Sequence, residues 1–126
     1  MINLLQQYHC ELQTELSDIL EYWIKYTTDE NDGGFYGKID AENNRETTAP
    51  KGAVLNARIL WSFAAAYNCT SNEKYLAMAD RAFQYINTCF VDKVYGGIFW
   101  TVNFKGEPAD TKKAGICNCL FAVCIQ

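Results

Sequence analysis

A chain of 126 residues with a formal net charge of −4 fits one folded domain. Apolar residues make up 49% of the sequence and aromatic residues 14%, which is enough for a core and too much for a disordered chain. The acidic balance, without a stripe of Lys or Arg to neutralise phosphates, argues against a nucleic-acid partner.

The sequence also gives no sign of membrane insertion or export. Its longest apolar runs, such as residues 60–67, are far shorter than the ~20 residues that a membrane span needs. The first residues lack a basic start followed by a long apolar run, so no secretory signal is visible. We therefore expect no membrane partner and a cytoplasmic location.

Six cysteines raise the alternative of a disulfide-stabilised secreted domain. Cys69 and Cys89, however, lie within or at the ends of predicted helices, where a reduced cysteine acts as a small hydrophobe. No CxxC pair occurs, Cys117 and Cys119 have the wrong spacing for a zinc knuckle, and His9 lies far away in sequence. We expect reduced cysteines and no metal site.

The chain repeats itself at an offset of 63 residues. Self-similarity at a fixed period indicates an array of supersecondary units, none of which buries its apolar face alone. Two such units fit the chain, at about residues 1–63 and 64–126. The pairs that share the offset include Tyr22 and Tyr85, Asp29 and Asp92, Gly33-Gly34 and Gly96-Gly97, Ile39 and Val102, and Asp40 and Asn103.

The first unit begins with a predicted helix that ends before a glycine turn at residues 29–34. Residues 35–39 follow as a short extended piece, and Pro50 suits the start of a second helix over residues 51–68. The second helix is apolar around most of its circumference, which indicates burial on several sides. The apolar positions of the two helices are Leu12, Leu16, Ile19, Leu20 and Trp23, then Val54, Leu55, Leu60, Trp61, Phe63, Ala64 and Tyr67.

In the second unit, Thr70 and Glu73 match a capping box in front of a third helix. A second glycine turn, an extended piece over residues 98–102 and a loop with Gly106 and Pro108 precede a final helix, predicted from near Thr111 to the end of the chain. The inner stripe of the third helix is Tyr75, Leu76, Ala79, Ala82, Phe83 and Ile86. We predict an all-α fold of two helical hairpins with short β pieces at the Gly-Gly turns.

Two hairpins leave apolar faces without partners, since such arrays need roughly three or more units for stability. We expect Trp61, Phe63 and Tyr67, and the stripe of Tyr75, Leu76 and Phe83, to need hairpins beyond residue 126. The isolated chain is therefore expected to self-associate.

Three segments together resemble the N-acylglucosamine 2-epimerase superfamily, and most closely its cellobiose (mannobiose) 2-epimerase branch. They are residues 32–37 (DGGFYG), 50–61 (PKGAVLNARILW) and 95–100 (YGGIFW), and the resemblance extends from about residue 8 to 113. It implies an (α/α)6 toroid of six hairpins, which at this period requires roughly 380 residues. The chain would then be the N-terminal part of one such domain, about two hairpins of six.

The resemblance implies a cofactor-free enzyme that interconverts glucose and mannose at the reducing end of β-1,4-linked disaccharides. In the ring-opened sugar the C2–H lies beside an aldehyde, so a base can remove the proton to give an enediolate. Return of a proton to the opposite face inverts C2. This chemistry needs a proton-transfer group on each face, for which histidine is suited, and a positive charge near the developing oxyanion.

Through the Asn56-Ala57-Arg58 motif, Arg58 corresponds to the active-site arginine of the family and is the candidate substrate-binding residue. The alternative is that Arg58 pairs with a carboxylate on a neighbouring helix. The family's two catalytic histidines belong to later hairpins, and His9 aligns with neither. The chain thus holds no catalytic residue of the family, and we expect it to be inactive by itself.

The tail, residues 114–126, departs from the family pattern. After Lys113 the family continues with a helix whose tyrosine lines the sugar site, whereas with a one-residue gap Cys117 takes that place here. Two explanations stay open: a divergent helix end, or a single-base slip in a run of lysine codons. The DNA sequence downstream of the codon for Lys113 distinguishes them.

Two other functions remain as alternatives. One is a two-hairpin module for sugar binding or protein interaction. The other is a different carbohydrate-active enzyme on the same toroid, such as a glycoside hydrolase or lyase with paired carboxylates. The available acids Asp29, Asp32 and Asp40 are more typical of turns, and the Asn56-Ala57-Arg58 motif favours the epimerase. The choice among glucosyl disaccharide, mannosyl disaccharide and N-acylglucosamine stays open.

Overall fold

The computed structural model describes residues 2–113, which form three helices and a small sheet. Helix α1 (Ile2–Thr27) is followed by a long loop, strand β1 (Lys51–Gly52) and helix α2 (Ala53–Thr70). Helix α3 (Glu73–Tyr85) continues into a π-helical turn, η1 (Ile86–Phe90). Strands β2 (Thr101–Val102) and β3 (Pro108–Asp110) join β1 in an antiparallel sheet of order β1-β2-β3. The predicted fold of helical hairpins with short β pieces is confirmed.

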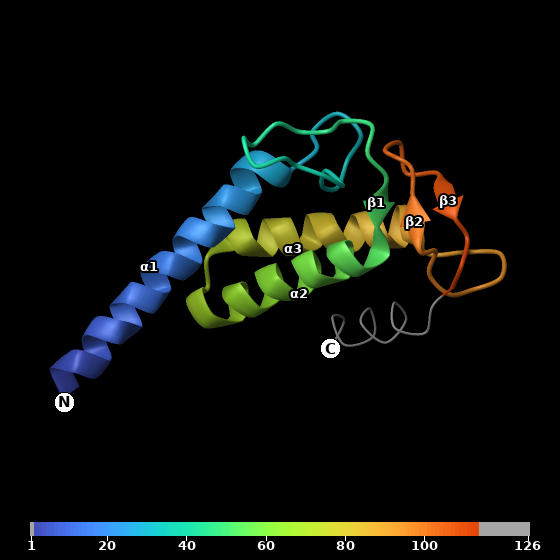
Figure 1. Cartoon of the computed structure of the whole chain (residues 1–126). Helices are drawn as coiled ribbons and strands as arrows, with labels where there is room; N and C mark the ends of the chain where they lie inside the picture. Colours follow the sequence, from blue (N-terminus) through green and yellow to red (C-terminus); the bar gives the residue numbers. More distant parts are fainter. Residues whose placement is uncertain (1, 114–126) are drawn as a thin grey trace.

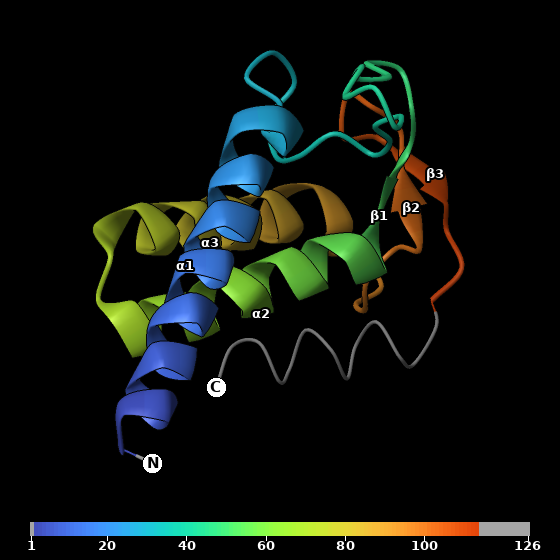
Figure 2. The same ribbon diagram turned by 60° about the vertical axis from the view of Figure 1, so that its left-hand side comes forward.

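Helices α2 and α3 lie side by side as a hairpin, and α1 crosses them near one end (Figures 1 and 2). The N-terminal half of α1 projects away from the hairpin in Figure 1. Leu12 is accordingly 70% exposed, and Ile19 is 47% exposed, whereas Leu20, the next residue, faces the body of the molecule and is 5% exposed. The apolar stripe predicted for this helix is therefore covered only towards its C-terminal end.

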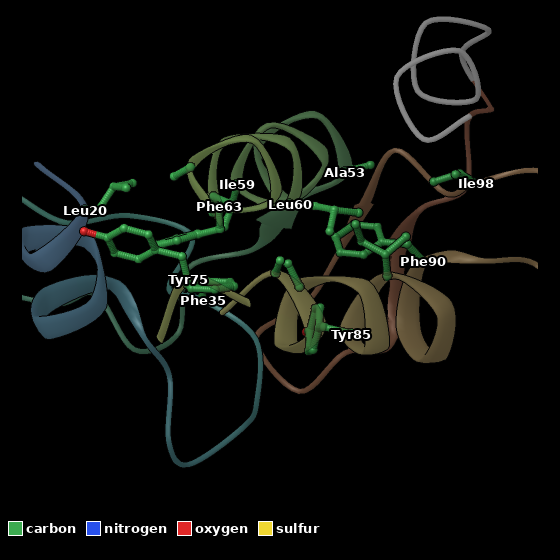
Figure 3. Close-up of a cluster of buried hydrophobic side chains, with 14 of the residues drawn as sticks. Leu20, Phe35, Ala53, Ile59, Leu60, Phe63, Tyr75, Tyr85, Phe90 and Ile98 are labelled. Carbon is green, nitrogen blue, oxygen red and sulfur yellow. The ribbon is translucent and has the colours of Figure 1, made fainter. Parts of the chain in front are cut away.

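The core lies between α2, α3 and the loops that flank them (Figure 3). The ring centroids of Phe63 and Tyr75 are 6.1 Å apart, and those of Tyr85 and Phe90 are 5.9 Å apart in an edge-to-face arrangement. Phe63 and Tyr75, which the sequence placed against hairpins beyond residue 126, are thus buried within this chain. Trp61 and Leu76 are 55% and 41% exposed, as expected for residues that need a further hairpin to cover them.

Asn72, and not the predicted capping box, caps α3. Its side chain accepts a hydrogen bond from the backbone N–H of Lys74 at 3.0 Å. The hydroxyl of Thr70 donates to the carbonyl of Ala66 at 2.8 Å, because Thr70 still belongs to the last turn of α2. The capping-box prediction was wrong because α2 extends two residues further than its sequence pattern indicated.

Two other boundaries also differ from the prediction. Lys51 and Gly52, predicted as the first helical residues, form strand β1 and pair with Val102 and Thr101. Residues 111–113, predicted as the start of the final helix, are not helical, and the remainder of that prediction lies outside the described residues. None of the described helices is both long and apolar enough to cross a membrane.

Hydrogen bonds recur at the 63-residue offset seen in the sequence. The N–H of Tyr36 donates to Thr27 at 2.8 Å, and that of Phe99 donates to Phe90 at 2.9 Å. The same offset relates the β-bridges Thr28–Phe35 and Val91–Ile98, and the loop bonds from the N–H of Asp40 to Asn44 and of Asn103 to Glu107. The loops of the two units therefore share one backbone geometry. The outer bounds of the units and the atypical tail stay predictions.

A buried ion pair holds the first glycine turn against the start of α2. The Lys51 Nζ lies 2.8 Å from Asp29 Oδ2 and donates to the carbonyl of Gly33 at 2.7 Å, and each side chain is 1% exposed. Asp29 Oδ1 accepts the backbone N–H groups of Asn31 and Asp32. Burial raises the pKa of Asp29, but the N–H of Asp32 and the Lys51 ammonium outweigh it, so this pKa lies below its ordinary value.

The second turn carries a matching pair. Lys113 is ion-paired with Asp92, whose carboxylate also accepts the backbone N–H groups of Val94 and Tyr95. The Lys113 hydrogen bond, followed by these two N–H groups, lowers the pKa of Asp92 to about 2. Both turns are thus built around an aspartate that binds its own backbone and a lysine further along the chain.

We expect Lys51→Met to destabilise the fold strongly, because it leaves the Asp29 carboxylate buried without its cation. Removal of one partner of a buried pair costs about 3–5 kcal/mol. The matched control is Lys38→Met, which breaks the Lys38–Glu46 pair, whose side chains are 67% and 50% exposed. Exposed pairs contribute at most about 1 kcal/mol. The measurement is the urea midpoint of the circular dichroism signal at 222 nm. Equal midpoints for the two variants would contradict a structural role for the buried pair.

Candidate functional site

Helix α2 places Arg58 on the surface while its neighbours in sequence face the core. Ala57 is 3% exposed and Ile59 is 4% exposed, whereas Arg58 is exposed, because successive helical residues point in directions about 100° apart. Arg58 lies at the wall of a cavity of about 320 Å³ between α1 and α2. The other lining residues are Ile19, Leu20, Trp23, Leu55, Ile59, Ser62 and Phe63.

The alternative of a structural ion pair finds no support at Arg58. Among residues 2–113 the ion pairs join Lys38, Lys51, Lys74, Arg81 and Lys113 to carboxylates, and none includes Arg58. Arg58 is thus an exposed cation that lines the adjoining cavity. Such a fork of fixed charge is suited to a pair of sugar hydroxyls or to an oxyanion.

Asn56 completes the polar part of the motif from the buried side of α2. Its side-chain amide donates to the carbonyl of Gly52 at 2.8 Å, and the residue is 1% exposed. Its Oδ1 is buried and has no hydrogen-bond partner in the part of the chain that the structure describes. Asn56 therefore satisfies a carbonyl at the start of α2, close to the strand that contains Lys51. The sequence signal was a polar residue among apolar neighbours.

A second cavity adjoins the first and is richer in aromatic side chains. It has a volume of about 250 Å³ and shares Trp23 and Leu55 with the cavity beside Arg58. The rest of its lining is Tyr22, Thr27, Tyr36, Gly37, Lys38 and Ile39. Sequence reasoning missed this group, because Tyr36 and Lys38 are brought to α1 by the loop and share no periodicity with it.

Among residues 2–113, no acid or base other than Arg58 itself lines the cavity beside Arg58. His9 is exposed on α1, ten residues before Ile19, or about 15 Å along the helix axis. Asp29 and Asp40 accept backbone N–H groups in their own loops, as predicted for turn-forming acids. In the described part of the chain, Arg58 and the cavities thus provide a positive charge and an apolar surface suited to binding, without an acid–base pair.

Metal-binding and disulfide chemistry find no support in the described part of the chain. No group of three or more His, Cys, Asp or Glu side chains there is placed to hold a metal ion. Cys10, Cys69 and Cys89 are free thiols, with Cys10 and Cys69 exposed. The exposure of Cys69 corrects the expectation that it acts as a buried hydrophobe. Cys117 and Cys119 lie outside the described residues.

The chain has the fold of known sugar epimerases. The chain superposes on a sugar epimerase from a ruminal bacterium with a TM-score of 0.86 and 33% identity. The superposition covers 92% of this chain and 30% of that epimerase. It also superposes on the cellobiose 2-epimerase from Spirochaeta thermophila with a TM-score of 0.85 and 36% identity. This superposition covers 93% of this chain and 29% of that enzyme.

Sequence comparison then gives the family. The cellobiose 2-epimerase of Bacteroides fragilis is 47% identical over 104 residues, which are 82% of this chain and 26% of that enzyme. The cellobiose 2-epimerase of Ruminococcus albus is 39% identical over the same shares. The N-acylglucosamine 2-epimerase (GlcNAc 2-epimerase) family model matches residues 33–123, and the chain belongs to this family. It spans about a quarter of the length of these relatives.

We expect Arg58→Ala to leave the stability of the chain nearly unchanged, because the side chain is exposed and has no ion pair with the described residues. The change in unfolding free energy should stay within about 0.5 kcal/mol. Ile59→Ala, at the next and buried position, is the matched control and should cost about 2–5 kcal/mol. Urea unfolding of both variants is the measurement. A loss at Arg58 as large as that at Ile59 would restore the structural interpretation.

Proposed function

We propose that this chain is part of a sugar 2-epimerase and that the complete enzyme interconverts glucose and mannose at the reducing end of β-1,4-linked disaccharides. The observation that carries the proposal is Arg58, an exposed cation without an ion pair among the described residues, beside an aromatic and apolar cavity on α2. Relatives with 37–47% identity over most of the chain are named cellobiose 2-epimerases, which supports the substrate class.

In this proposal Arg58 stabilises negative charge and does not transfer protons. A base takes the C2 proton of the open-chain sugar, and the electron pair of the broken C–H bond forms an enediolate with negative charge on its oxygens. Arg58 donates two N–H groups to these oxygens, an interaction that strengthens as the charge develops. Donation of a proton to C2 from the opposite face completes the inversion. The reaction transfers no electrons to an acceptor, so the proposal requires no cofactor.

The two proton-transfer groups come from outside this chain in the proposal. His9 is the single histidine of the sequence, and its exposed place on α1 is remote from the Arg58 cavity. The glycoside hydrolase alternative needs two carboxylates flanking a substrate, roughly 5–10 Å apart. Asp29 is fully buried in an ion pair and Asp40 is held by its own loop, so neither supports that alternative.

The chain alone should not epimerise cellobiose or mannobiose above the buffer blank, measured by NMR of the C2 proton. Turnover should require the remainder of the ring, for which we choose the Bacteroides fragilis enzyme without its 104 matched residues, as a separate polypeptide. In the completed ring Arg58→Lys should lower kcat/KM at least about tenfold, because lysine keeps the charge and loses the fork. Turnover by the chain alone, or an active ring indifferent to Arg58→Lys, would contradict the proposal.

The isolated chain should also self-associate through the exposed apolar face of α1. Leu4, Leu5, Tyr8 and Leu12 are 49–70% exposed along this helix, which single soluble domains rarely tolerate. We expect ANS binding and oligomers in light scattering, and Leu12→Glu should reduce both. Leu76→Glu on α3 is the control and should have less effect. A monodisperse monomer would instead favour a self-sufficient two-hairpin binding module.

A further inference from the structure

The first glycine turn is clasped by a residue of the next unit. Arg81 of α3 donates its Nε–H to the carbonyl of Gly34 at 3.0 Å and an Nη2–H to the carbonyl of Asp29. The ring of Tyr85, one helical turn later, covers Gly34 so closely that a Cβ there would lie 2.8 Å from ring atoms. Arg81 therefore ties the first unit to the second through the two backbone carbonyls that close the turn.

The second glycine turn has the same backbone geometry. In the first turn the N–H of Gly33 donates to Asp29 at 3.2 Å and that of Asp29 donates to Gly34 at 3.1 Å. In the second, the N–H of Gly96 donates to Asp92 at 3.0 Å and that of Asp92 donates to Gly97 at 2.9 Å. The glycine φ angles are 85° and 67° in the first turn and 77° and 82° in the second. The second turn thus presents the same pair of carbonyls.

Residues 2–113 provide no side chain that clasps this second turn. The carbonyls of Asp92 and Gly97 receive backbone N–H groups from within the turn, and the described hydrogen bonds include no side-chain donor to either. A Cβ on Gly96 would meet no atom within 4 Å, whereas one on Gly33 would meet the Tyr85 ring at 3.7 Å. Gly97 is half-buried where Gly34 is buried, and Val94 and Tyr95 are 80% and 88% exposed.

We propose that the turn at residues 92–97 is a docking site for an arginine-bearing helix of the next hairpin in the array. The arginine, on a helix supplied from outside the 126 residues of this chain, donates two N–H groups to the carbonyls of Asp92 and Gly97, as Arg81 does to those of Asp29 and Gly34. Its neighbour one helical turn later covers the glycine pair, as Tyr85 covers Gly34. Arginine and not lysine fits, because two carbonyls of one turn require the rigid fork of the guanidinium.

The test uses the full chain and the same remainder of the Bacteroides fragilis enzyme, in which the partner helix is sought. A photo-reactive p-benzoylphenylalanine replaces the exposed Tyr95, and mass spectrometry identifies the cross-linked peptide. Gly97→Asn is the blocking variant, because asparagine tolerates positive φ. By the 63-residue offset Gly97 corresponds to Gly34, where an added Cβ would lie 2.8 Å from the Tyr85 ring. Gly96→Asn imposes the same backbone requirement where the equivalent Cβ makes an ordinary contact, and it is the matched control.

The expected cross-link is to a helix that contains an arginine. Gly97→Asn, or replacement of that arginine by lysine, should lower the yield at least about tenfold, as the loss of a charged hydrogen bond predicts. Gly96→Asn should leave the yield nearly unchanged. A cross-link to a second copy of this chain or to a segment without arginine, equal yields for the two glycine variants, or no association at micromolar concentrations would each overturn the proposal. None of these outcomes depends on epimerase turnover.

Discussion

The buried pair of Asp29 and Lys51 is the interaction on which the arrangement of the first unit depends. Lys51 belongs to β1, the strand that leads directly into α2, and its Nζ reaches both the Asp29 carboxylate and the Gly33 carbonyl. The ion pair therefore joins the end of α1, the glycine turn and the start of the helix that carries Arg58. A buried pair contributes little net stability, since desolvation offsets its attraction, but a misplaced partner leaves a buried charge. The pair thus selects one geometry for the turn.

The repeat, the three helices and the glycine turns were predictable from sequence because each leaves a local pattern. The glycine pairs at positive φ and the helical spacing of apolar residues are such patterns. The partner of Asp29 was not predictable, because nothing local shows that Lys51 is buried 22 positions away. The capping residue was misassigned because Thr70 and Asn72 are both good caps, and Thr70 belongs to the last turn of α2, which leaves Asn72 to cap α3. The exposure of α1 likewise depends on neighbours and not on its own periodicity.

Part of the candidate site was likewise predictable from the sequence, and part was not. Arg58 was predicted through the resemblance of a short motif, and the structure adds that its side chain is exposed beside a cavity whose walls come from both α1 and α2. Trp23 lines both this cavity and the adjoining aromatic cavity. Its helical spacing alone indicated only that it packs in the core. Tyr36 and Lys38 reach the second cavity through the loop that follows the turn at residues 29–34. The sequence therefore identified the charged residue of the candidate site, but it did not show which residues line its cavities.

Contacts between units explain how an array of this kind can vary in sequence and keep its geometry. Arg81 binds carbonyls of the first turn, and every residue type supplies a carbonyl, so this contact places few demands on the turn beyond its backbone shape. The backbone shape in turn needs the glycine pair and an aspartate that accepts its own N–H groups. The glycine pair and the aspartate are among the positions that recur at the 63-residue offset. Arg58 does not recur at this offset, since residue 121 is Phe, so the charge of the candidate site belongs to one unit while the turn geometry belongs to both.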